Sequence, residues 1–163
     1  MEKSKAIEVI RLVVSIIICQ FAGFIGSIFT RMSIPTWYAT IEKPSFTPPN
    51  WLFAPVWTTL FVLMGISAFL VWRKGLGDKR AKIALSIFAA QLVFNIFWSV
   101  AFFGLRSPLA GLIVIIILLA AILLTIIEFV KVSVVAGILL IPYILWVSFA
   151  AVLNTSIFTL NVK

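Results

Sequence analysis

Residues 107–127 read SPLAGLIVIIILLAAILLTII, a run of 21 residues without a charge. A helix needs about 20 apolar residues to cross the hydrocarbon core of a bilayer. The part from Ile113 to Leu124 is apolar throughout, without the alternation of lipid-facing and lumen-facing residues that a barrel strand requires. A helix also satisfies its own backbone hydrogen bonds in hydrocarbon. This stretch therefore predicts a transmembrane helix.

Charged residues divide the rest of the chain into four further uncharged stretches, each long enough to cross a bilayer. The first follows a basic N-terminus, as in a signal peptide, but it has 19 residues and no small-x-small cleavage site precedes Arg31. We therefore expect a retained helix there. The five predicted spans are 12–30, 51–72, 83–105, 108–127 and 133–157. The predicted fold class is all-α: a polytopic membrane protein in which residues 1–163 form a single bundle of five transmembrane helices.

The composition agrees with a membrane protein and excludes several other classes. Of the 163 residues, 63% are apolar and 11% are charged, and the mean hydropathy is +1.23. Soluble domains average about 45–50% apolar and about 25% charged residues, and a soluble fold of this length could not bury so much apolar surface. A soluble enzyme, a disordered tail and a nucleic-acid-binding domain are therefore excluded. With no His and one Cys, Cys19, the chain has no ligand set for a metal, and none is predicted.

The net charge of +8 is explained by membrane topology. The N-terminal segment and the loops 73–82 and 128–132 together carry nine Lys and Arg, whereas the segments on the opposite side carry four. This bias predicts a cytoplasmic N-terminus and an external C-terminus, in an integral multi-pass protein that we place in a bacterial cell membrane. The loop 73–82 is basic enough to bind an anionic lipid, but basic loops are the default for insertion alone.

The first loop, residues 31–50, reads RMSIPTWYATIEKPSFTPPN and differs from a simple connector. Five of the seven prolines lie between positions 35 and 55, and three of the six tryptophans lie between positions 37 and 57. Proline fixes φ and removes a backbone donor, so this stretch is stiff as well as aromatic. We predict a structured lid over the helix ends. For Trp37 an interfacial aromatic belt is an equally good interpretation.

Polar and aromatic side chains share one face on two of the predicted helices. On helix 83–105 they are Gln91, Asn95, Trp98 and Ser99, and on helix 133–157 they are Tyr143, Trp146, Ala150 and Asn154. Unpaired amides in hydrocarbon are costly, so both faces should point into the bundle. The spacing alone slightly favours hydrogen bonds between helices over ligand contacts on helix 83–105, and it does not separate core packing from a ligand site on helix 133–157.

Together with Trp57 and Phe61 of helix 51–72, these faces predict a cavity between helices, with aromatic walls and a few polar groups. Sites for apolar ligands are built in this way. A flat apolar ligand would stack against the tryptophan rings. Because the chain has no His, it offers no imidazole that could bind the iron of a ligand in this cavity.

Four motifs along the chain resemble the translocator protein family, also called TspO, the tryptophan-rich sensory proteins and the peripheral benzodiazepine receptor. They read WYxxIxKPxFxPP over 37–49, FxPxWxxL over 53–60, QLxxNxxWS over 91–99 and PYxxWxxxAxxLN over 142–154. The resemblance covers nearly the whole chain and suggests a bacterial member. It implies binding of protoporphyrin IX and of benzodiazepine-site apolar ligands, a sensory or stress-regulatory role, contact with membrane lipid, and a homodimer through helix 83–105. No cofactor is implied, because protoporphyrin IX would be the ligand or the substrate. With no His to bind iron, the chain favours the metal-free porphyrin, or contact without His ligation.

The resemblance also implies which residues contact the ligand. The positions that match the pocket of the family are Tyr38, Pro48, Phe53, Trp57, Phe61, Asn95, Trp98, Ser99, Trp146, Ala150 and Leu153. In bacterial relatives, two tryptophans that match Trp57 and Trp146 are implicated in light- and oxygen-dependent breakdown of protoporphyrin IX. An enzyme with these two catalytic residues is therefore the alternative function. A small-molecule transporter is a second alternative, which the lack of an ionisable residue inside the predicted spans disfavours.

Two positions depart from the family pattern. The sterol-recognition segment of the family has a Tyr and a basic residue where this chain has Thr155 and Thr159. Such motifs are weak even when they are complete, so specific sterol binding is not predicted. Phe46 stands where relatives often have Trp, which keeps an aromatic ring but not the indole.

Overall fold

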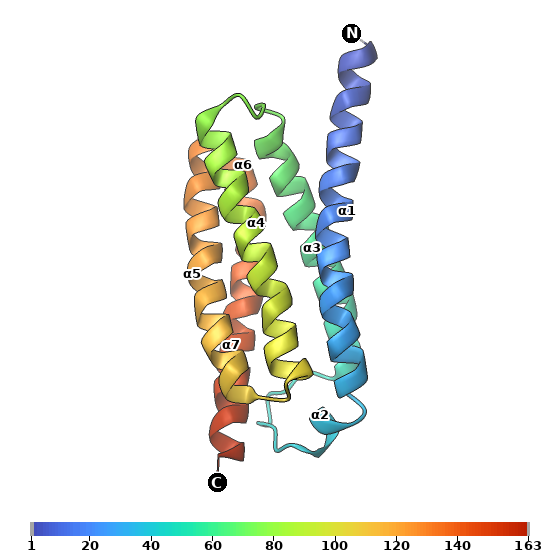
Figure 1. The fold of residues 1–163 in the computed structure, drawn as a ribbon, viewed down its shortest axis with the longest axis vertical. Coiled ribbons are helices and arrows are strands. Elements are labelled where there is room, and N and C mark those ends of the chain that lie inside the picture. Colours follow the sequence, from blue (N-terminus) through green and yellow to red (C-terminus); the bar gives the residue numbers. More distant parts are fainter. Residues whose placement is uncertain (1, 163) are drawn as a thin grey trace.

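The computed structural model describes the backbone of residues 2–162 and the side chains of residues 5–162. In this part of the chain every regular element is helical, and five helices are long and apolar enough to cross a membrane. The all-α, five-span fold class is thereby confirmed (Figure 1). The elements are α1 (Glu2–Ser33), α2 (Trp37–Thr40), α3 (Asn50–Trp72), α4 (Lys79–Ser99), η1 (Val100–Gly104), α5 (Pro108–Val132), α6 (Val134–Leu139) and α7 (Ile141–Asn161).

The helix boundaries follow local capping more closely than charge. The Asp78 carboxylate accepts hydrogen bonds from the backbone of Arg80 and Ala81 and so starts α4. The Ser107 hydroxyl accepts from the Ala110 backbone N–H at the start of α5, with Pro108 in the first turn. Such caps satisfy backbone donors that have no partner inside the helix. The predicted end of the fourth span at 127 falls short, because α5 continues to Val132.

The last span is divided into two helices. α6 ends at Leu139 and α7 begins at Ile141, so the interruption falls directly before Pro142. Proline has no N–H to continue the helical ladder, which accounts for a break at this point. The Ser133 hydroxyl caps the start of α6 by accepting from the Ala136 N–H. The Ala136 carbonyl in turn accepts a hydrogen bond from the Ser67 hydroxyl at 2.6 Å, which ties the upper part of this span to α3.

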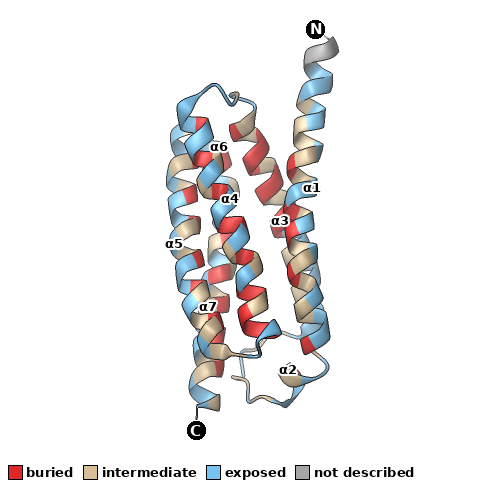
Figure 2. Cartoon of the chain, viewed as in Figure 1, coloured by how far each residue is buried: buried red, intermediate tan, exposed pale blue. Residues whose placement is uncertain are grey.

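The bundle has α1 at one edge, where it packs on α3 and α4, while α5, α6 and α7 form the other side. Buried residues concentrate on the helix faces that point inward, and the N-terminal turns of α1 extend beyond the bundle (Figure 2). Glycines allow α1 to approach closely. A Cβ atom added at Gly65 would lie 2.6 Å from the Cα atom of Ile16, so no larger residue fits between α1 and α3 there.

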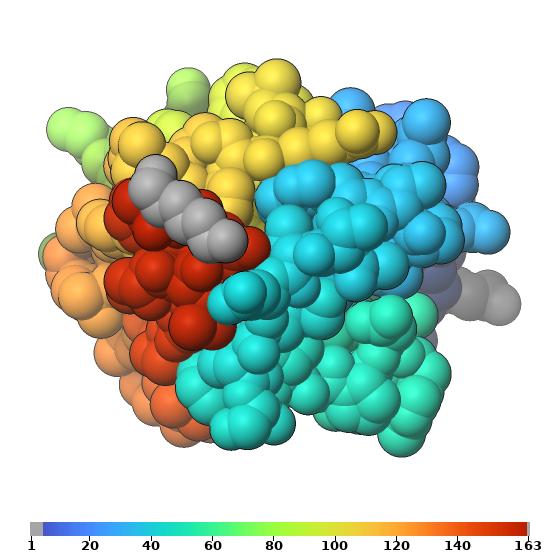
Figure 3. All heavy atoms as spheres, turned by 90° about the horizontal axis from the view of Figure 1, so that it is seen from below, coloured from blue at the N-terminus to red at the C-terminus, as the bar shows by residue number. Residues whose placement is uncertain are grey.

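The first loop folds across one end of the bundle, beside the C-terminal end of α7 (Figure 3). Tyr38 of α2 is 3% exposed, and its ring lies 5.7 Å from that of Phe103. Burial raises the pKa of the Tyr38 hydroxyl above its ordinary value. Asn161 of α7 holds the loop by donating to the Glu42 carbonyl at 2.9 Å and accepting from the Glu42 N–H at 3.1 Å. The predicted lid is therefore an ordered cap on the end of the bundle.

Candidate functional site

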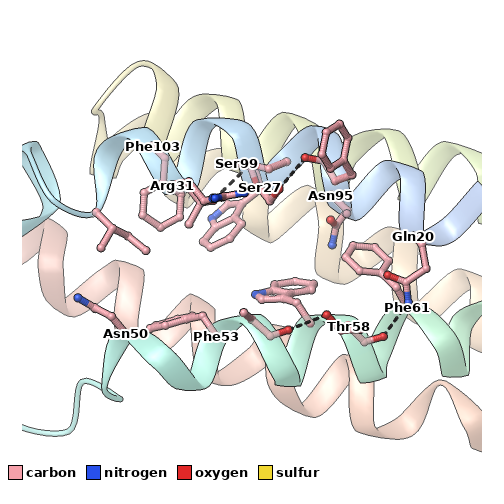
Figure 4. A pocket seen from close by; sticks show the side chains of 18 of the residues that line it. Gln20, Ser27, Arg31, Asn50, Phe53, Thr58, Phe61, Asn95, Ser99 and Phe103 are labelled. Carbon is pink, nitrogen blue, oxygen red and sulfur yellow. Dashed lines mark hydrogen bonds between the residues drawn. The ribbon is translucent and has the colours of Figure 1, made fainter.

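A pocket of about 740 Å³ lies between α1, α3 and the C-terminal half of α4 (Figure 4). Its more exposed lining residues, among them Phe24, Trp51 and Thr58, belong to α1 and α3. The pocket therefore opens along the seam between these two helices. The full lining is Gln20, Gly23, Phe24, Gly26, Ser27, Thr30, Arg31, Ile34, Asn50, Trp51, Phe53, Ala54, Trp57, Thr58, Phe61, Asn95, Trp98, Ser99 and Phe103.

The inner wall of the pocket is aromatic. Trp57 of α3 and Trp98 of α4 lie with ring centroids 6.4 Å apart and planes inclined by 31°. Phe61 stacks on Trp57 at 5.6 Å, deeper along α3. Phe103 belongs to η1, where the helix widens for one turn before α5. Such π-type turns are frequent at functional sites, and here the turn places Phe103 on the pocket wall.

Buried hydrogen bonds to α7 hold this wall from behind. The Asn95 side chain donates to the Tyr143 hydroxyl at 3.0 Å, and that hydroxyl donates to the Gln91 side-chain oxygen at 2.9 Å. The Trp98 indole N–H donates to the Asn154 side-chain oxygen at 3.3 Å, and Asn154 donates to the Pro108 carbonyl at 2.7 Å. Asn95 and Trp98 thus both line the pocket and bond between helices, whereas Gln91 is a structural residue that does not line it.

Six of the eleven predicted ligand-contact residues line this one pocket, namely Phe53, Trp57, Phe61, Asn95, Trp98 and Ser99. The structure places the other five outside it, namely Tyr38, Pro48, Trp146, Ala150 and Leu153. On the α7 side the space is filled, because Tyr143 and Asn154 pack directly against α4. The ring of Trp146 lies 6.2 Å from that of Phe53, which lines the pocket, whereas Trp146 does not.

Sequence reasoning missed the α1 wall of the pocket. Gln20, Gly23, Gly26 and Ser27 line it, and the Gln20 side chain donates to the Thr58 carbonyl of α3 at 2.9 Å. The sequence carries a signal for this wall, because a polar amide and small residues at helical spacing within a predicted span point to a helix contact. The motifs that carried the family resemblance lie elsewhere in the chain, and so drew attention away from α1.

Charge on the lining is confined to one end. Among the described residues that line the pocket, Arg31 is the one ionisable group, in the last turn of α1. Figure 4 shows Arg31 near Phe103 and across from Asn50, while Gln20 and Phe61 lie at the other end. Among the side chains of residues 5–162, no group of three or more His, Cys, Asp or Glu residues is placed to hold a metal ion.

Comparisons with known proteins agree with the motifs. The sequence matches the TspO/MBR family over residues 15–160. It is similar to the tryptophan-rich protein TspO of Archaeoglobus fulgidus, with 48% identity over 94% of this chain and 99% of the relative. It is likewise similar to the tryptophan-rich protein TspO of Chlorobaculum tepidum, with 44% identity over 94% of this chain and 98% of the relative. The human translocator protein is 36% identical over 80% of this chain and 78% of its own length.

Proposed function

This chain belongs to the TspO/MBR family of membrane proteins, and on that premise we propose that it binds protoporphyrin IX and other flat apolar molecules in the pocket between α1, α3 and α4. The observation that supports this most directly is the pair of inclined indole rings, Trp57 and Trp98, on the wall of a pocket that opens between two helices long and apolar enough to cross a membrane. A planar aromatic macrocycle dissolved in lipid would meet these rings as it enters.

The size and chemistry of the pocket support the same proposal. Pockets for small molecules have volumes of about 300–1,000 Å³, and their walls are mostly apolar with a few polar groups that set orientation. The volume of about 740 Å³ lies in that range. Asn95 and Ser99 supply polar atoms on an otherwise aromatic wall. Benzodiazepine-site ligands, which are also flat and apolar, would use the same rings.

The wider role follows from the family and the topology. We propose a sensory or stress-regulatory function in which ligand occupancy of the seam reports porphyrin in the membrane. The protein would lie in a bacterial cell membrane with its N-terminus in the cytoplasm, because basic residues concentrate on that side. We also propose a homodimer through α4, where Ser86 and Ala90 form a small-residue pair on the exposed face.

A titration tests the binding proposal. The purified full-length protein in an uncharged detergent is titrated with protoporphyrin IX and followed by the porphyrin absorbance band. We expect saturable binding that Trp57→Ala weakens about tenfold, because the main stacking surface is lost. Trp72→Ala is the matched control, since Trp72 lies at the opposite end of α3, beside Arg11. Absence of saturation, or equal effects of the two substitutions, would contradict the proposal.

The position of Trp57 also supports a second candidate, light- and oxygen-dependent degradation of bound protoporphyrin IX. An oxidisable indole on the pocket wall is in place for such chemistry. Trp146, the other proposed catalytic residue, lies behind Phe53. The candidate therefore separates into a direct role for Trp57 and an indirect one for Trp146, which porphyrin bleaching can distinguish.

A further inference from the structure

We infer that Arg31 binds a carboxylate of the ligand at the loop end of the pocket, so that an acidic ligand binds more tightly than an uncharged ligand of the same shape. The inference deepens the proposed function, on which it rests, by assigning a charge preference and an orientation to the ligand. It predicts that the flat body lies along Trp57 and Trp98, while the acidic edge lies beside the last turn of α1.

The pocket is chemically asymmetric along its length. Arg31 is its one ionisable lining residue, and Thr30 and Asn50 are polar neighbours at the same end. The other end is formed by Gln20 and Phe61, and Gln20 and Arg31 are 11 positions apart along α1. At 1.5 Å of helical rise per residue this distance is about 16 Å. A ligand that fills the pocket therefore has one edge near the guanidinium and the other in an apolar environment.

No protein carboxylate neutralises Arg31 among the side chains of residues 5–162. The two ion pairs found there join Arg73 to Glu8 at 3.3 Å and Lys131 to Glu128, both away from the pocket. The Asp78 carboxylate caps α4. Arg31 is exposed at the edge of the pocket, where its guanidinium can donate two parallel hydrogen bonds to a carboxylate of the ligand.

Membrane depth supports the same orientation. Arg31 lies in the last turn of a membrane-spanning helix, where the first loop begins, which places it near the interface with water. Acidic amphiphiles in a bilayer keep their charge at this level and their apolar part deeper. A carboxylated macrocycle could thus enter the seam without turning over. A lipid phosphate is the other oxyanion available to Arg31. Arg31 could bind it without any ligand in the pocket.

A binding experiment with two proteins and two ligands tests whether Arg31 binds a carboxylate of the ligand or a lipid phosphate. Wild type and Arg31→Gln, as full-length proteins in an uncharged detergent, are each titrated with protoporphyrin IX and with its dimethyl ester. The ester keeps the ring but removes both charges. Arg106→Gln is the matched control, because Arg106 lies at the same end of the bundle but lines a different hollow, with Trp37 and Phe158. Arg31→Lys keeps the charge and tests whether the fold tolerates a change at this position.

We expect Arg31→Gln to weaken binding of the diacid about fivefold and to leave binding of the ester unchanged, with Arg31→Lys in between and Arg106→Gln at the wild-type level. Equal affinities of wild type and Arg31→Gln for the diacid would overturn the inference while leaving the proposed function intact. An equal loss for diacid and ester would also overturn it, because Arg31 would then serve the fold or the bilayer. If wild type bound neither porphyrin, the proposed function itself would fail.

Discussion

The seam between α1 and α3 and the interface between α4 and α7 are built from similar residues, yet only the seam is hollow. At the α4–α7 interface, the large side chains Tyr143 and Asn154 fill the space and pair with polar groups of α4. At the seam, the small residues Gly23, Gly26 and Ser27 of α1 lie between the longer side chains of Gln20 and Arg31 and leave space beside the rings of α3 and α4. The comparison teaches that residue size on the facing helix, rather than aromatic content, decides where the bundle leaves room.

The largest effect is expected from adding bulk to the seam. A Cβ atom at Gly23 would collide with the Phe61 ring, which is stacked on Trp57. Gly23→Ala should therefore displace the pocket wall, lower stability by about 1–3 kcal/mol and weaken porphyrin binding severalfold. Gly77→Ala is the matched control, because nothing lies within 4 Å of a Cβ atom there. Thermal unfolding and a porphyrin titration check both. Equal behaviour of the two variants would contradict the close approach of α1.

Substitutions at the α4–α7 interface should change the free energy of unfolding more than they change porphyrin binding. Tyr143→Phe removes the hydroxyl that accepts from Asn95 and donates to Gln91, leaving two buried amide groups short of a partner. We expect a loss of about 1–2 kcal/mol in the free energy of unfolding, with a smaller effect on porphyrin affinity. Tyr38→Phe is the control, since the Tyr38 hydroxyl makes no hydrogen bond within residues 5–162. If Tyr143→Phe unfolds like wild type, the hydrogen bonds that join Asn95, Tyr143 and Gln91 do not stabilise the fold.

If the protein degrades porphyrin, substitutions of Trp57 and Trp146 show which of the two regions holds the reacting ligand. Trp57 lies on the pocket wall, whereas Trp146 contacts Phe53 from the α7 side. Trp57→Phe should slow light-dependent bleaching of protoporphyrin IX severalfold, and Trp146→Phe should slow it less. Absorbance over time, with free porphyrin as the reference, measures this. A greater loss for Trp146→Phe would place the reacting ligand beside α7 instead.

The smallest effect is expected at the loop. Asn161→Ala removes the two hydrogen bonds that fix Glu42 to the end of α7. Because these groups are exposed, the loss in stability should be about 0.5–1.5 kcal/mol. Porphyrin affinity should change little, since only Ile34 of the loop proper, between α1 and α3, lines the pocket. Proteolysis within residues 35–49 reports the loosening. A large loss of affinity would show that the loop closes the ligand site.

The fold was largely predictable because hydrocarbon imposes a simple rule, in which a long charge-free stretch must be a helix. The end of α5 was harder to predict from charge. The helix continues past Glu128 and Lys131, because these two residues form an ion pair with each other near its C-terminal end. For the site, spacing correctly predicts that Trp98 and Tyr143 face the interior. Spacing does not show whether an inward-facing side chain packs against another side chain or lines a pocket, because that depends on the residues of the facing helix. The α1 wall and the position of Trp146 therefore required the structure.

The most direct test is an experimental structure of the protein with bound protoporphyrin IX. The account predicts the macrocycle in the seam, with its plane against Trp57 and Trp98, one edge beside Ser27 of α1, and the propionates at Arg31. A macrocycle lodged between α4 and α7, in contact with Trp146 and Ala150 and away from α1, would contradict it.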